Sequence, residues 1–153
     1  IVIVHGSARL FSGGVRTTTS GVEMHGSYIP RNLNNDIAII SHDSVGYTNV
    51  IRNIALPSGD QLNNNFAGTW AQAAGFGKTG DSIDISISQQ LSHVSLQVIT
   101  NAVCTQFFGG VILASTLCTS SAGGVGTCQG DSGGPLSISG PTLVIMLYIS
   151  TVK

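Results

Sequence analysis

The sequence predicts an all-β protein whose strands form a sandwich or a barrel. Short apolar or β-branched runs alternate with turns rich in glycine, asparagine and serine, and 20 of the 153 residues are glycine. This alternation, without an amphipathic helix of ordinary length, is typical of all-β domains. The composition, 42% hydrophobic and only 8% charged, argues against disorder and suits an extracellular protein.

Three strands are expected in the first 40 residues. Residues 1–4 form an apolar run that predicts a buried strand. A turn at residues 11–14 separates it from a second short strand at 22–24, which leads into a turn at 25–28. The third strand is the β-branched run at 37–40, which follows a polar cluster.

The rest of the chain predicts an irregular connection followed by further strands and one helix. Residues 41–68 are polar and irregular. In the strand at 91–99, Val94, Leu96 and Val98 share one face. A short helix over 101–107 has Asn101 as its N-cap. The remaining strands are expected at 70–77, 115–118, 135–138 and, from its apolar character, 143–149.

Charge and cysteine content exclude several classes of function. The net charge of −1 provides no electrostatic attraction to nucleic acid or to an anionic membrane. No apolar run reaches the roughly 18 residues that a membrane helix needs. The three cysteines lack a C-x-x-C spacing, so neither a metal site nor a cofactor is expected, and their odd number leaves one without a partner.

The hexapeptide Gly130-Asp131-Ser132-Gly133-Gly134-Pro135 carries the chemistry. Glycines on both sides of a serine allow a tight turn and the close approach of a substrate. A nucleophilic serine needs such a turn, with backbone N–H groups directed at the oxygen of the carbonyl it attacks. An ordinary glycine-rich loop is the plain alternative. The G-x-S-x-G of α/β-hydrolases also fits the letters, but Pro135 disfavours the helix that must follow, and no Asp, Glu or His comes after Ser132.

Five blocks in order make the chain resemble the chymotrypsin-like serine proteases, above all the digestive chymotrypsins of insects. They are F-S-G-G, N-N-D-I-A-I-I, W-A-Q-A-A-G-F-G, the cysteine pattern and G-D-S-G-G-P. The resemblance covers residues 1–141 and implies two six-stranded Greek-key β-barrels. The first barrel is expected to be incomplete and the second to lack its C-terminal end.

The resemblance also assigns roles to particular residues. Ser132 matches the nucleophile, and Asp36 matches the buried carboxylate that orients the catalytic histidine, although an Asp before a strand is commonly a turn residue. The N–H groups of Gly130 and Ser132 match the oxyanion hole. Asp131 matches a buried carboxylate that pairs with a new N-terminal ammonium after zymogen cleavage. Gly126 matches the uncharged base of the primary pocket and implies a preference for large apolar or aromatic side chains; the alternative is a flexible glycine loop.

The same resemblance implies a disulfide between Cys104 and Cys118. Cys128 matches a cysteine whose partner lies downstream of Lys153. Residues 143–153 depart from the family, because the S-x-G segment expected there is missing. This tail is either divergent or read in the wrong frame.

No histidine of this chain fits the catalytic base. The family order is His, Asp, Ser, yet neither histidine before Asp36 lies in the A-A-H-C context of the family. Surface or turn positions are expected for all four histidines: His5, His25, His42 and His93. Ile1 lies too close to Asp36 to be the activation terminus. The chain therefore reads as a fragment of a secreted serine endopeptidase, acting in the gut lumen on protein or peptide substrates, with protein inhibitors as further partners and as a monomer.

We expect the fragment to comprise part of the first barrel (1–50), a connection (51–68) and a truncated second barrel (69–153). It should not react at Ser132, and its open strand edges should aggregate. A buried Asp131 carboxylate without its cation should lower the stability of the fold by about 3–5 kcal/mol. The alternative is a protease homologue that has lost its catalytic histidine and acts as a binding module.

Overall fold

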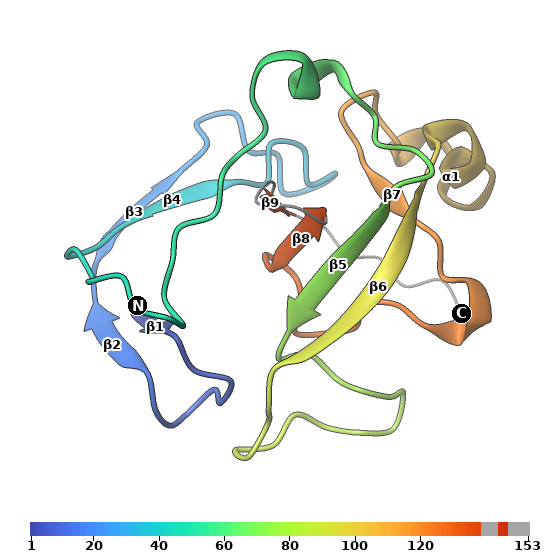
Figure 1. Cartoon of the computed structure of the whole chain (residues 1–153). Coiled ribbons are helices and arrows are strands. Elements are labelled where there is room, and N and C mark those ends of the chain that lie inside the picture. Colours follow the sequence, from blue (N-terminus) through green and yellow to red (C-terminus); the bar gives the residue numbers. More distant parts are fainter. Residues whose placement is uncertain (139–143, 147–153) are drawn as a thin grey trace. The chain divides into compact units, whose positions relative to one another are not determined.

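The structure is a computed structural model that describes residues 1–138 and the backbone of residues 144–146. The chain forms two compact units (Figure 1). The first comprises Ile1–Asn53 and Asp84–Leu91, and the second Ile54–Ile83 and the chain from Ser92. Strands dominate both units, which confirms the predicted all-β class.

The first unit contains two separate antiparallel strand pairs. Strand β1 (Val2–His5) pairs with β2 (Val15–Thr18), with Ile3 opposite Thr17. Strand β3 (Gly21–Met24) pairs with β4 (Ala38–Ser41). Strand β2 was not expected, since its sequence V-R-T-T lacks an apolar run; it is formed by pairing with β1, not by its own pattern.

The expectation of buried strands in this unit is wrong. Each pair is a two-stranded sheet, so within the described residues these strands gain little cover from neighbouring strands. Apolar side chains of β3, β4 and the residue before β4 are exposed by 41–68%: Val22, Met24, Ile37, Ile39 and Ile40.

A short excursion of the chain joins the first unit from far along the sequence. The N–H of Leu91 donates to the carbonyl of Ala8 at 2.8 Å, and Gln90 forms a β-bridge with Arg9. Residues 84–91 thereby pack with the first unit although they lie between two strands of the second. The expected boundaries at 50/51 and 68/69 do not assign residues 84–91 to the first unit, and this division into domains stays a prediction.

The second unit is built on one antiparallel five-stranded sheet in the order β7-β6-β5-β8-β9. Its strands are β5 (Trp70–Gly75), β6 (Ser92–Ile99), β7 (Cys118–Thr119), β8 (Pro135–Ile138) and β9 (Val144–Met146). Figure 1 shows β5 and β6 running side by side along their lengths. Strand β8 pairs with the other edge of β5, with Ala73 opposite Leu136, and so brings the hexapeptide to the end of β5.

The core of this unit lies on one face of the sheet. Ala71 and Ala73 of β5 and Leu96 and Val98 of β6 alternate with exposed residues, and Leu136 is fully buried. The predicted shared face of Val94, Leu96 and Val98 is confirmed, with Val94 partly buried against this cluster.

One helix packs beside the sheet, with a cap different from the predicted one. Helix α1 spans Asn101–Phe108, and its N-cap is Thr100, whose hydroxyl accepts the N–H of Val103. The prediction of Asn101 as the cap is wrong because the Asn101 side-chain amide donates instead to the carbonyl of Leu113, at 2.8 Å. The helix is followed by a 3₁₀ turn (Gly109–Val111).

The strand expected at 115–118 is also shifted. A turn in which the N–H of Thr116 donates to the carbonyl of Leu113 occupies this position, so β7 begins only at Cys118. Two other 3₁₀ turns lie at Gly59–Asn63 and Ala122–Gly124. Of the strand expected at 143–149, residues 144–146 form β9, while 143 and 147–149 lie outside the described residues, as does most of the 143–153 tail.

Candidate active site

Ser132 lies on two consecutive turns that lead into β8. The N–H of Asp131 donates to the carbonyl of Cys128 at 3.1 Å, and the N–H of Gly134 donates to the carbonyl of Asp131 at 2.9 Å. Gly130 and Gly133 have φ angles of 98° and 82°, a region that residues with a Cβ rarely adopt. These turns leave the Ser132 side chain exposed.

The two candidate oxyanion donors make no hydrogen bond to the part of the chain that the structure describes. Neither the N–H of Gly130 nor that of Ser132 donates a hydrogen bond to another residue in the ranges 1–138 and 144–146. A backbone donor in an exposed turn is available to a ligand oxygen when no carbonyl of the protein occupies it. Their assignment as an oxyanion hole stays a prediction.

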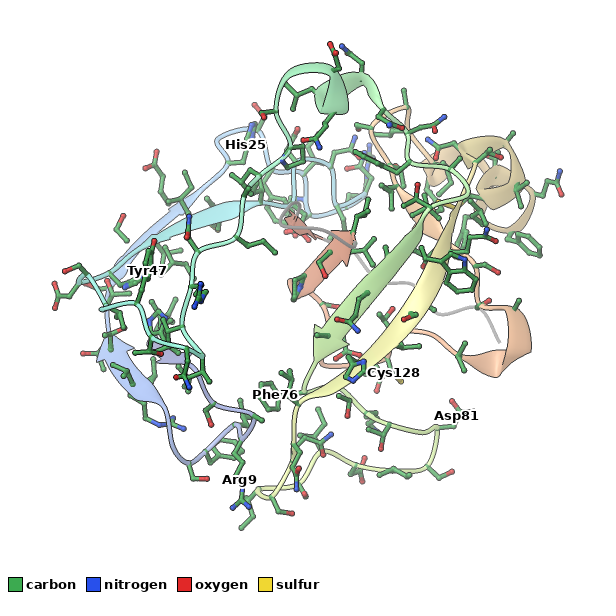
Figure 2. All side chains as sticks on the ribbon, in the orientation of Figure 1. Arg9, His25, Tyr47, Phe76, Asp81 and Cys128 are labelled. Carbon is green, nitrogen blue, oxygen red and sulfur yellow. A yellow bond between two sulfur atoms is a disulfide. The ribbon has the colours of Figure 1, made fainter. Side chains whose placement is uncertain are left out.

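Both oxygens of the Asp131 carboxylate accept backbone hydrogen bonds. The N–H of Gly77 donates to Oδ1 at 2.8 Å, and the N–H of Cys128 donates to Oδ2 at 2.9 Å. Figure 2 labels Phe76 and Cys128, which belong to the two segments that supply these donors. The expectation of a buried carboxylate is wrong, because Asp131 is half-buried and accepts two hydrogen bonds. The penalty of about 3–5 kcal/mol stays a prediction.

The N-terminal ammonium has a partner in its own unit. The Ile1 nitrogen donates to the carbonyl of Thr19 at 2.8 Å, next to the β1–β2 pair. The assignment of Asp131 as an activation carboxylate therefore gains no support from Ile1 and stays a prediction.

Asp36 lies in the first unit, two residues before β4, and Ser132 lies in the second. Asn35 has a φ of 58°, and the N–H of Ile37 donates to the carbonyl of Asn35, so Asp36 occupies the middle of a tight turn. The carboxylate is exposed, which corrects the expectation of a buried one: the two-stranded β3–β4 sheet offers it little cover.

Three of the four histidines lie on the surface, as expected, and each makes a local contact. The Nδ1 of His25 accepts the N–H of Ser27, and that of His93 pairs with the side chain of Gln72 on the neighbouring strand. Figure 2 shows His25 in the connection that leaves β3. The Nδ1–H of His42 donates to the carbonyl of Asp43.

The expectation of a surface or turn position is wrong for His5. This residue ends β1 and is half-buried, and among the described residues its Nε2 is buried without a hydrogen-bond partner. Its ring lies 5.0 Å from that of His42 within the first unit. The ring of His42, from a distant part of the chain, lies beside this side chain, and the local sequence around His5 does not record that contact.

The structure contains the disulfide between Cys104 and Cys118, with the two Cα atoms 6.3 Å apart. It ties α1 to β7, and both cysteines are buried. Cys128 is a free cysteine in this structure, and the partner expected downstream of Lys153 stays a prediction.

Gly126, the candidate base of the primary pocket, lies in an exposed loop after the 3₁₀ turn at 122–124. A Cβ added there would meet nothing within 4 Å.

The sequence analysis treated Gly75 and Gly77 only as the end of a strand and missed their contact with Asp131. The letters G-F-G, which begin at the last residue of β5, indicate a close approach of backbone, but they do not identify the partner.

Among the described residues, no group of three or more His, Cys, Asp or Glu side chains could hold a metal ion. In the same part of the chain, no helix is long and apolar enough to cross a membrane.

Comparison with known proteins connects these features to one family. The family model described as trypsin matches residues 2–151. The collagenase of Hypoderma lineatum is 35% identical over 147 residues, which are 95% of this chain and 54% of that protein. Trypsin beta of Drosophila erecta is 37% identical over 142 residues, covering 91% and 54%. The chain therefore spans about half the length of the curated relatives it matches.

Solved structures confirm the predicted fold class. An HL collagenase structure matches with a TM-score of 0.81 and 35% identity over 90% of this chain and 58% of that one. The structure of an inactivated protease paralogue from the scabies mite matches with a TM-score of 0.83 over 99% and 66% of the two chains. At 21% identity, the second likeness shows the fold alone.

Proposed function

Because the chain belongs to the trypsin family, we propose that the protein of which it is part is a serine endopeptidase that works through an acyl-enzyme. The observation that carries the proposal is the exposed Ser132, whose own N–H and that of Gly130 donate to no described residue. A relative named collagenase and a relative named trypsin, each at least 35% identical, support the same chemistry.

The first step is attack by the Ser132 hydroxyl on the carbonyl carbon of the peptide bond. A histidine takes the hydroxyl proton and passes it to the departing amine, which leaves the acyl group on Ser132. Water then attacks the ester with the same base and releases the carboxylic acid. Asp36 orients the imidazole and stabilises its protonated form.

The N–H groups of Gly130 and Ser132 bind the oxyanion that forms on the carbonyl oxygen. Such donors stabilise the transition state more than the ground state, and each is worth about 3 kcal/mol. Their contribution depends on fixed direction, which the turns around Asp131 supply.

We assign the catalytic histidine to a part of the protein outside residues 1–153. His25 and His42 make contacts within single turns, His93 pairs with Gln72 of the neighbouring strand, and none of the four histidines has the sequence context of the family base. Ser132 in the isolated chain is then an ordinary alcohol.

The uncharged Gly126 supports a preference for large apolar or aromatic side chains at the primary position, because no carboxylate attracts Lys or Arg there. The disulfide supports secretion, since such bonds persist in oxidising compartments. We place the enzyme in the gut lumen, as a monomer that acts on protein and peptide substrates and is held in check by protein inhibitors.

Labelling with a peptidyl phosphonate bearing phenylalanine tests the proposal. The full-length protein should be labelled at Ser132, whereas its Ser132→Ala variant and the 153-residue chain should not. A folded full-length protein that fails to react would instead favour a non-catalytic binding module. Labelling of the 153-residue chain would show that the base lies within it. A lysine phosphonate that reacts faster would overturn the assigned specificity.

A further inference from the structure

The end of β5 approaches the Asp131 carboxylate more closely than any side chain would allow. A Cβ on Gly77 would lie 2.5–2.7 Å from the carboxyl carbon and both oxygens of Asp131. A Cβ on Gly75 would overlap Oδ1 and lie 2.9 Å from the carboxyl carbon. Real Cβ atoms do not approach other atoms so closely, so an alanine at either position would have to displace the Asp131 carboxylate.

The need for glycine here is a matter of space and not of backbone conformation. Neither Gly75 nor Gly77 has a φ in the left-handed region, unlike Gly130 and Gly133. Other glycines of the same unit, such as Gly110, would meet nothing within 4 Å on gaining a Cβ. What distinguishes Gly75 and Gly77 is therefore the carboxylate that fills the volume beside them.

The contact extends along both segments. The N–H of Lys78 donates to the carbonyl of Gln129 at 2.9 Å, next to the bonds from Gly77 and Cys128 to Asp131. A Cβ on Gly134 would lie 2.8 Å from the carbonyl oxygen of Asp131 and 3.2 Å from that of Ala74. Residues 74–78 and 128–134 thus lie backbone against backbone.

We propose that Gly75 and Gly77 are positioning residues for the nucleophile turn. Their bare backbone forms a cradle, defined here as Gly75, Gly77 and the N–H of Cys128, which holds the Asp131 carboxylate. Because the main chain of Asp131 takes part in both turns around Ser132, fixing this carboxylate fixes the peptide planes on either side. The cradle thereby sets the direction of the Gly130 and Ser132 N–H groups.

The catalytic meaning of this role rests on the proposed function, but the geometry can be tested without activity. Hydrogen–deuterium exchange, read by mass spectrometry on the full 153-residue chain at low micromolar concentration, reports on both segments. The variants are Gly75→Ala and Gly77→Ala, and Gly110→Ala is the matched control, since it adds the same methyl group in open space.

Gly75→Ala and Gly77→Ala should each raise exchange in two segments, 74–79 and 128–134, by about tenfold or more, as expected when a local cluster of hydrogen bonds opens. Strand β6 should exchange as in the wild type, and Gly110→Ala should change neither segment. Unchanged exchange at 128–134 would overturn the proposal. Equal loosening of β6 would also overturn it, because a general loss of stability would then explain the effect.

The same substitution in the full-length protein separates positioning from simple stability. Gly77→Ala should lower kcat for a peptide substrate by about tenfold or more with little change in KM, because a misdirected oxyanion donor acts on the transition state. If the full-length protein has no activity but Gly75→Ala and Gly77→Ala raise exchange as expected, the proposed function is wrong and the positioning role of the cradle stands. If Gly77→Ala keeps the wild-type kcat, the cradle has no role in catalysis.

Discussion

Replacement of Asp131 by asparagine is the sharpest test of how the nucleophile turn is held together. Asparagine has the same shape as aspartate but offers one acceptor oxygen and one donor NH₂ group. Asp131 uses both oxygens as acceptors, toward Gly77 and Cys128. In Asp131→Asn, one of these two N–H groups must face another donor.

The expected loss of stability follows from these two bonds. A hydrogen bond to a charged group contributes about 1.5–3 kcal/mol, and a buried donor left without a partner costs about 1–3 kcal/mol. Asp131 is only half-buried, so water relieves part of that cost, whereas Gly77 is buried. We therefore expect the unfolding free energy of the second unit to fall by about 2–3 kcal/mol.

Urea unfolding followed by the fluorescence of Trp70 measures this change. Trp70 is the one tryptophan of the sequence and begins β5, which ends at the Asp131 contacts. A loss of about 2–3 kcal/mol lowers the urea midpoint by about 1 M or more.

Asp60→Asn is the matched control, because it removes the same charge from an exposed turn of the same unit. It should change stability by less than about 0.5 kcal/mol. Equal midpoints for Asp131→Asn and Asp60→Asn would refute the role of these hydrogen bonds.

Three further changes test the second unit, and one tests the first. Replacing Cys104 and Cys118 by alanine removes a cross-link between residues 14 apart and should cost about 3 kcal/mol in the same urea assay; a cost similar to that of Cys128→Ala would contradict it. Leu136→Ala empties a fully buried site and should cost about 2–5 kcal/mol. Thr100→Ala removes the helix cap and should cost about 1 kcal/mol, seen also as less helical circular dichroism; no change would return the capping role to Asn101. In the first unit, Ile39→Lys on an exposed strand should reduce aggregation measured by light scattering, and an unchanged aggregation rate would contradict the predicted hazard.

The sequence was informative wherever one segment determines its own structure. Alternation alone placed Val94, Leu96 and Val98 on one face of β6, because side chains of a strand point to opposite faces in turn. The turn around Ser132 was likewise predictable from its glycines, two of which adopt positive φ.

Features that depend on a distant partner were not predictable in this way. Strand β2 forms because it pairs with β1. Asn101 is not the helix cap because its side-chain amide donates to the carbonyl of Leu113. The exposure of Asp36 reflects how little surrounds the β3–β4 pair, which no local pattern records. Gly77 and Asp131 lie 54 residues apart in the sequence, so the letters G-F-G could not identify their own partner.

The hydrogen bonds at Asp131 also change how an activating cation would act in the proposed enzyme. A carboxylate has about four lone-pair positions, and the two backbone donors occupy one on each oxygen. An ammonium group from elsewhere in the full protein would then add to a carboxylate that is already oriented. The ammonium group would further stabilise an orientation that the N–H groups of Gly77 and Cys128 already hold. Its removal should therefore loosen the nucleophile turn less than Asp131→Asn does.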